Sequence, residues 1–105
     1  MTQKIAGVGA DAPTVVNEKG AKQSKTLYRA DLLPPLATLA VAGVLHEGAV
    51  KYGDTNWHGI SVRDHLNHAM IHVFAWLAGD TQDDHLEHFA CRALMALEIA
   101  KMEKK

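Results

Sequence analysis

The chain has 105 residues, of which 11 are basic and 12 acidic, so its formal net charge is -1. This length fits one domain, and the balanced charge excludes the strong basic field that attracts nucleic-acid polymers. The sequence has no run of about 18 apolar residues, so no membrane contact is expected. A single cysteine, together with the lack of an apolar leader in residues 1–20, favours a reduced, cytoplasmic location.

The first 27 residues contain scattered polar residues and glycines without a sustained period. We expect an N-terminal arm or loop over 1–27, with at most a short extended piece at Thr14–Val16. A helical domain then occupies 28–105. The pair Pro34-Pro35 suits the first turn of a helix, where the missing N–H of proline costs nothing. This first helix should run to about Val50.

A loop separates the first helix from the second. The segment KYGDTNWHGI, residues 51–60, is rich in the glycine, aspartate and asparagine that form turns. Ser61 is a plausible N-cap for a helix that ends near Ala78, and Gly79 suits that helix end. The sequence therefore predicts a second helix between two well-marked boundaries.

A third helix is expected from about Gln82 to Met102, capped by Asp80 or Thr81. Three helices with short connections predict an all-α, antiparallel helical bundle. Because a domain this small buries little of its surface, we expect oligomerisation to complete the core.

Helical periodicity of about 100° per residue divides the second helix into two adjacent arcs. The first arc is apolar and is expected to face the core; it contains Leu66, Met70, Val73, Phe74 and Leu77. The neighbouring arc contains His65, His68 and His72, so these histidines should border the core. His65 lies one turn too far from the following bend to join the others easily.

One stripe of the third helix begins with polar residues and continues with apolar ones. It contains Asp84, His88, Cys91, Met95, Ile99 and Met102. Asp84 and His88 are four residues apart and therefore lie side by side. Imidazole and carboxylate groups at this spacing suit metal binding in helical bundles. The expected metal ligands are therefore His68, His72, Asp84 and His88.

Each of these residues also has an interpretation without a ligand. Histidines on helices are commonly half-buried structural residues, and acidic residues in a first helical turn are favourable without any function. We assign Asp83 to this second group and expect His46, His58 and His85 at the surface. Cys91 should be a small buried hydrophobic residue rather than a nucleophile.

Glu47 shares the inward face of the first helix, where a carboxylate is costly unless it is paired or binds a metal. It could form an ion pair with Lys51 at i+4 or act at the site. The candidate catalytic carboxylates are accordingly Glu47, Asp80 and Asp84, as metal ligands or as bases that orient water.

The loop after the first helix combines a cation, a phenol, an amide and an indole within seven residues. These are Lys51, Tyr52, Asn56 and Trp57. An ammonium group can contact phosphate, and an indole can stack on a base. Arg63 adds a second potential phosphate contact. The loop could also be purely structural, but its composition favours a nucleotide as the substrate or ligand.

Three segments carry a family resemblance, over about Leu27 to Glu98: LLPPLATLAVAGVLHEGAVKYGDTNW, HLNHAMIHVFAWLAGD and DDHLEHFACRALMALE. Together, with the motifs K-Y-G-x-x-N-W and H-L-x-H, they resemble the phage-encoded dATP/dGTP diphosphohydrolase-like family. The resemblance implies an all-α MazG-like fold, a dimer or tetramer, and hydrolysis of (d)NTP to (d)NMP and pyrophosphate with magnesium or manganese. For a phage protein, the location would be the host cytoplasm.

The sequence departs from the acidic motifs of the wider superfamily, E-x-x-E and E-x-x-D. Val50 and Lys51 stand where a second acid would follow Glu47, and no E-x-x-D occurs. Asp84-x-x-x-His88 instead resembles the D-x-x-x-H of phosphoribosyl-ATP pyrophosphohydrolases. Imidazole ligands favour Mn, Fe, Co, Ni or Zn over magnesium.

Three functional hypotheses follow from the sequence. The first is a metal-dependent nucleoside triphosphate pyrophosphohydrolase with a nucleotide substrate. The second is a protein that binds or sequesters a nucleotide without turnover. The third is a helical interaction protein whose histidines are structural.

Overall fold

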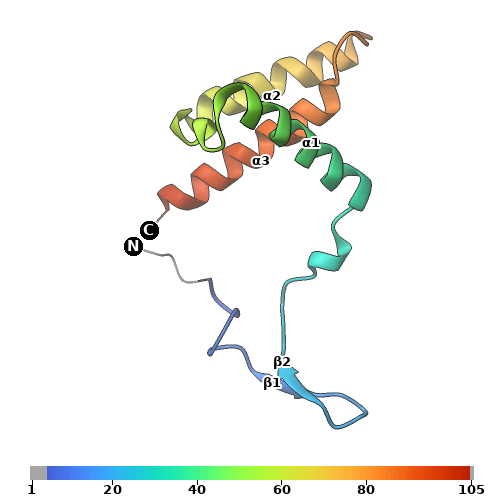
Figure 1. The fold of residues 1–105 in the computed structure, drawn as a ribbon, viewed down its shortest axis with the longest axis vertical. Coiled ribbons are helices and arrows are strands. Elements are labelled where there is room, and N and C mark those ends of the chain that lie inside the picture. Colours follow the sequence, from blue (N-terminus) through green and yellow to red (C-terminus); the bar gives the residue numbers. More distant parts are fainter. Residues whose placement is uncertain (1–4, 105) are drawn as a thin grey trace. The chain divides into compact units, whose positions relative to one another are not determined.

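A computed structural model describes residues 5–104 of the chain (Figure 1). Its elements are β1 (Thr14–Val16), β2 (Lys22–Ser24), η1 (Ala30–Leu32), α1 (Pro35–Tyr52), η2 (Asn56–Gly59), α2 (Val62–Leu77) and α3 (His85–Glu103). The three long helices make the protein all-α, as the sequence predicts. The chain divides into two compact units after Leu33, and the second unit contains all three α-helices. In the described residues, no helix is long and apolar enough to cross a bilayer.

The N-terminal unit contains a small antiparallel hairpin. Thr14 of β1 pairs with Ser24 of β2, and the Asn17 side chain accepts hydrogen bonds from the backbone N–H groups of Lys19 and Ala21 in the connecting turn. The strand at Thr14–Val16 confirms the expected extended piece. Its partner β2 was not expected, because the polar residues KQS carry no alternating apolar pattern.

The second unit is built on the α2–α3 pair, which is packed side by side, with α1 crossing α3 (Figure 1). Pro35 occupies the first turn of α1. Ser61 is the N-cap of α2, because its Oγ accepts a hydrogen bond of 3.1 Å from the backbone N–H of Asp64. Both features confirm the sequence prediction.

The end of α2 is a turn in which Gly79 has a φ of +92°, a conformation that is costly for residues with a Cβ. The backbone N–H of Gly79 donates to the Trp76 carbonyl, and the N–H of Asp80 donates to the Ala75 carbonyl. These two bonds form a Schellman motif, which satisfies carbonyls that the ended helix leaves unpaired. Gly79 thereby ends α2, as predicted, and directs Asp80 toward α3.

The α2 face that packs inward carries His65, Ala69 and the half-buried His72 rather than the apolar arc. His65 is fully buried and Ala69 is 2% exposed, whereas Leu66, Met70, Phe74 and Leu77 are all exposed. The expectation that the apolar arc faces the core of the single chain is therefore wrong for these four residues, whereas Val73 is half-buried. The small side chain of Ala69 lets α2 and α3 approach closely, and the neighbouring imidazoles have hydrogen-bond partners across the interface between these two helices.

The buried stripe of α3 contains Cys91, Ala96 and Ile99. Cys91 is 2% exposed, which confirms its expected place in the core, and burial raises the pKa of its thiol. The helix begins at His85 rather than near Gln82, so Asp84 is the N-cap residue and makes no side-chain capping bond. Neither Asp80 nor Thr81 caps α3. Asp84 is exposed and lies before the helical stripe that it was expected to begin.

Candidate active site

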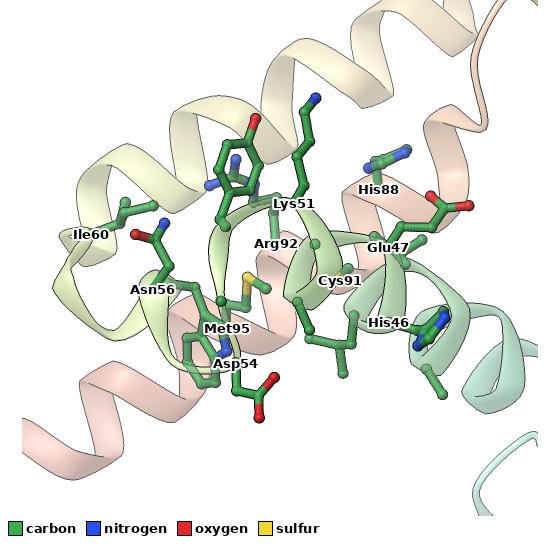
Figure 2. Close-up of a pocket in the computed structure, with 18 residues that line it drawn as sticks. His46, Glu47, Lys51, Asp54, Asn56, Ile60, His88, Cys91, Arg92 and Met95 are labelled. Carbon is green, nitrogen blue, oxygen red and sulfur yellow. The ribbon is translucent and has the colours of Figure 1, made fainter.

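A cavity of about 810 Å³ is lined by the C-terminal half of α1, the following loop with η2, and one side of α3 (Figure 2). Its polar lining residues include Glu47, Lys51, Tyr52, Asn56, His88 and Arg92. Cys91 and Met95 of α3 contribute apolar surface. The volume lies within the range of small-molecule sites, which commonly join a mostly apolar wall to a few polar groups.

Four of the five residues that the sequence assigned to a nucleotide line this cavity. They are Lys51, Tyr52, Asn56 and Trp57. Gly53 ends α1 with a φ of +98°, and this turn allows the chain to continue into η2 beside the same cavity. The Lys51 Nζ lies 5.3 Å from the centroid of the Tyr52 ring, a cation–π distance. Arg63 is exposed on α2 and is not among the lining residues.

A second polar group lies at the bend between α2 and α3. Ligand atoms of His72, Asp83 and His85 lie within 4.8 Å of one another, and we name these three residues the His/Asp cluster. His85 is 8% exposed, so its expected surface position is wrong. The cluster joins two imidazoles to one carboxylate, a set of donors that suits a divalent transition metal.

Hydrogen bonds orient the two imidazoles of the cluster. The Nδ1 atoms of His72 and His85 are 2.9 Å apart. On its other side, His85 Nε2 donates to Asp80 Oδ2 at 2.5 Å, because a carboxylate accepts hydrogen bonds. Carboxylate partners of this kind set the orientation of a metal-binding imidazole and raise its basicity. The Nδ1 atom of His85 is thus directed toward His72.

The electrostatics of the cluster favour the forms of His72 and Asp83 that bind metals. Burial lowers the pKa of His72, and the neighbouring His88 lowers it further, so the neutral imidazole is favoured near pH 7. The pKa of Asp83 is lowered by the hydrogen bond from the backbone N–H of Asp84, at 2.8 Å. Asp83 therefore remains ionised at neutral pH.

His88 connects the His/Asp cluster with the cavity. Its ring stacks on that of His72, with centroids 5.0 Å apart and an interplanar angle of 19°. Its Nε2 lies 3.6 Å from Asp83 Oδ1. The same residue lines the cavity, where Figure 2 shows it on the side of Glu47. A cation in the cluster would consequently lie beside the cavity.

The structure separates the four predicted metal ligands into two groups. His72 belongs to the His/Asp cluster and His88 contacts it. His68 is exposed, and Asp84 contributes a backbone N–H rather than a carboxylate to the cluster. Among the predicted catalytic carboxylates, Asp80 bonds to His85. Glu47 lines the cavity, but it is exposed, so its expected inward position in the core is wrong. In the described residues, no ion pair joins Glu47 to Lys51.

Three residues of the site were not selected from the sequence: Asp83, His85 and Arg92. Counting helical faces separated Asp83 from the histidines because it treated residues before His85 as helical. The short spacing of D-x-x-D-x-H at 80–85 is the sequence feature that indicates this site, because it brings two carboxylates near one imidazole in a turn. Arg92, one helical turn after His88, is not part of the metal-ligand or nucleotide-binding patterns predicted from the sequence.

The fold and the site together define the class of the protein, which is an all-α domain with a His/Asp cluster beside a ligand-sized cavity. A family model described as "dATP/dGTP diphosphohydrolase, N-terminal" matches residues 17–105. The chain therefore belongs to this dATP/dGTP diphosphohydrolase family. The match confirms the resemblance seen in the sequence and places the chain among the hydrolases. No curated protein and no solved structure matches the chain.

Proposed function

We propose that the chain is a metal-dependent pyrophosphohydrolase that converts a (d)NTP to a (d)NMP and pyrophosphate. The observation that carries this proposal is the position of His88, which lines the cavity and also contacts the His/Asp cluster. A nucleotide in the cavity could thereby place its phosphates near the cation. The family description supports a purine deoxynucleotide as the substrate.

The His/Asp cluster suits a divalent cation because His72 offers a neutral imidazole and Asp83 an ionised carboxylate. Together with His85 they would hold the ion, and His88 is close enough to assist. A bound divalent cation would offset phosphate charge and lower the pKa of a bound water. With imidazole ligands, we expect Mn or Co to support more activity than Mg, with Zn, Ni and Fe also able to bind.

Cavity residues would position the nucleotide. Trp57 and Tyr52 provide aromatic surfaces for the base, and Lys51 provides a charge for phosphate. Glu47 lies on the cavity wall and could orient the attacking water and accept its proton. The water oxygen would bond to the α-phosphorus as the bond from that phosphorus to the bridging oxygen breaks, and pyrophosphate would leave.

The decisive experiment incubates the chain with a panel of dNTPs and NTPs and with Mg, Mn, Co or Zn. Chromatography should detect a monophosphate and pyrophosphate in equal amounts. Asp83→Asn should abolish this turnover, whereas Asp64→Asn, a matched change in the first turn of α2, should retain it. Full activity in the Asp83→Asn variant would contradict the assignment of the cluster.

A protein that binds nucleotide without turnover is the alternative function. The His/Asp cluster favours it in one respect, because it contains a single carboxylate where the acidic motifs E-x-x-E and E-x-x-D would supply several. Tight dATP binding in EDTA by calorimetry, with no product under any metal, would decide for this alternative. The absence of both metal and nucleotide binding would instead support a helical interaction protein.

We also propose that the chain is a homo-oligomer, in which a second copy covers part of its apolar surface. The exposed α2 residues Leu66, Met70, Phe74 and Leu77 are between 44% and 65% exposed, and a contiguous surface of this kind is uncommon on monomers. Light scattering at micromolar concentration should give a mass of a dimer or tetramer. The mass of one chain would contradict this proposal.

A further inference from the structure

The histidine at the other end of the α2–α3 pair, His65, makes no contact with the His/Asp cluster. It is fully buried, and both of its ring nitrogens have partners. Arg92 Nη1 donates to His65 Nδ1 at 3.1 Å, and His65 Nε2 lies 3.0 Å from the Trp57 carbonyl oxygen. Because a guanidinium can only donate, His65 Nδ1 is the acceptor, and Nε2 carries the proton that is donated to Trp57.

Arg92 is held by this buried imidazole while it lines the cavity (Figure 2). It lies on α3 one turn after His88, on the same side of the helix. Within residues 5–104, no carboxylate lies within ion-pair distance of Arg92. A half-buried guanidinium without a carboxylate partner leaves its positive charge available for an anion that enters the cavity.

We propose that Arg92 binds the phosphate groups of the nucleotide and that His65 is its positioning residue. The inference rests on the proposed nucleotide site and assigns it an additional residue for substrate recognition. The planar guanidinium can donate two parallel hydrogen bonds to phosphate oxygens, while Lys51 supplies a point charge from α1. Since one guanidinium nitrogen is bonded to His65, its orientation is set before the substrate arrives.

His65 also connects this phosphate contact to the segment that would bind the base. Its bond to the Trp57 carbonyl fixes the backbone of η2 at the residue whose indole lines the cavity. The Trp57 and His65 rings meet edge to face, with centroids 6.3 Å apart. One buried imidazole therefore sets the positions of both the guanidinium and the indole.

The test measures binding by calorimetry in EDTA, so that it requires neither metal nor turnover. The ligands are dATP, inorganic tripolyphosphate and deoxyadenosine. Arg92→Gln should weaken dATP and tripolyphosphate binding by roughly 10- to 100-fold, the usual effect of losing a charged hydrogen bond. Binding of deoxyadenosine should not change. Arg92→Lys should restore part of the affinity, because the charge returns without the planar geometry.

The matched control is Lys101→Gln, which removes one positive charge from the last turn of the same helix and should leave all three affinities unchanged. Unaltered tripolyphosphate binding in Arg92→Gln, or no binding of it by the unmodified chain, would overturn the inference. Failure of the proposed function has a different signature: phosphate binding would still depend on Arg92, but no metal would give product.

Replacement of His65 distinguishes a role in positioning Arg92 from a role in the general stability of the fold. His65→Gln retains an N–H group that can donate to the Trp57 carbonyl, but it replaces the rigid ring acceptor for Arg92 by the oxygen of a flexible amide. It should weaken tripolyphosphate binding by roughly 3- to 10-fold and leave deoxyadenosine binding intact. Equal weakening of both ligands would show a merely structural role and overturn the assignment of His65.

Nitrogen NMR of the unmodified chain provides a second measurement that does not depend on the folding of a variant. The His65 ring should show an unprotonated Nδ1 and a protonated Nε2. Addition of tripolyphosphate should shift the Nδ1 resonance, because its donor Arg92 then also bonds to the phosphate. An Nδ1 resonance that does not move at saturating ligand would overturn the proposed connection.

Discussion

Two buried histidines lie toward opposite ends of the α2–α3 pair, and their partners differ. His85, at the bend, is bonded to the Asp80 carboxylate and faces another imidazole. His65 is bonded to a guanidinium and a backbone carbonyl. The first environment suits a cation, whereas the second already contains a positive charge and excludes one. Burial alone therefore does not tell a cation-binding histidine from a positioning histidine, whereas the atoms bonded to the ring do.

The largest effect is expected from a change at the end of the α2–α3 pair that we propose to bind the metal. His85→Ala removes one ligand of the His/Asp cluster and leaves Asp80 without its donor. Because substitutions of outer-shell partners alone cost about 10- to 100-fold in metal affinity, the loss here should exceed about 100-fold, with turnover lost in parallel. Titration with Mn or Co by calorimetry measures the first quantity and product chromatography the second.

In this variant, binding of tripolyphosphate in EDTA should remain, because the Arg92–His65 contact is unaffected. Loss of that binding as well would show that the two ends of the helix pair are not independent. Retained metal affinity would instead remove His85 from the cation site.

Asp80→Asn should have a smaller effect at the same end. The amide retains the size of the side chain but loses the charge that orients the His85 imidazole. We expect metal affinity to fall by about 10- to 100-fold, with little change in the ligand-free fold. Calorimetry with Mn gives the affinity, and circular dichroism monitors the fold. An affinity equal to that of the unmodified chain would contradict the role of Asp80.

Gly79→Ala tests the turn that directs Asp80. The φ of +92° would be strained with a Cβ, at a cost of about 1–2 kcal/mol, although no neighbouring atom lies within 4 Å of that Cβ. Thermal denaturation should show a lower midpoint. Gly43→Ala in α1, where φ is helical and the space is also open, should raise the midpoint slightly. A stabilised Gly79→Ala variant would contradict the turn geometry.

The smallest effect is expected in the pH dependence of the stability of the metal-free protein. The pKa of His72 is lowered by burial and then by His88, so below about pH 6.5 the unfolded chain binds its proton more readily than the folded chain. Stability should therefore fall as the pH is lowered from 7.5 to 5.5. The midpoint of thermal denaturation in EDTA should fall less in His72→Gln. An equal decrease in both proteins would contradict the lowered pKa.

Several local features could be predicted from the sequence because neighbouring residues determine them. Ser61 caps α2 through its own side chain, and Gly79 provides the positive φ that ends it. Most of the loop residues assigned to a nucleotide line one cavity because they follow one another along the end of α1 and η2. The apolar arc of α2 could not be placed correctly, because its burial depends on surfaces beyond this helix.

The sequence by itself determined the all-α class, the helix boundaries near α1 and α2, and the family. Tertiary structure alone decided which histidines meet. Asp83 precedes α3, so its carboxylate follows the path of a turn rather than a helical period of about 100° per residue. His65 and Arg92 are 27 residues apart, and only the packing of α2 on α3 brings the imidazole to the guanidinium.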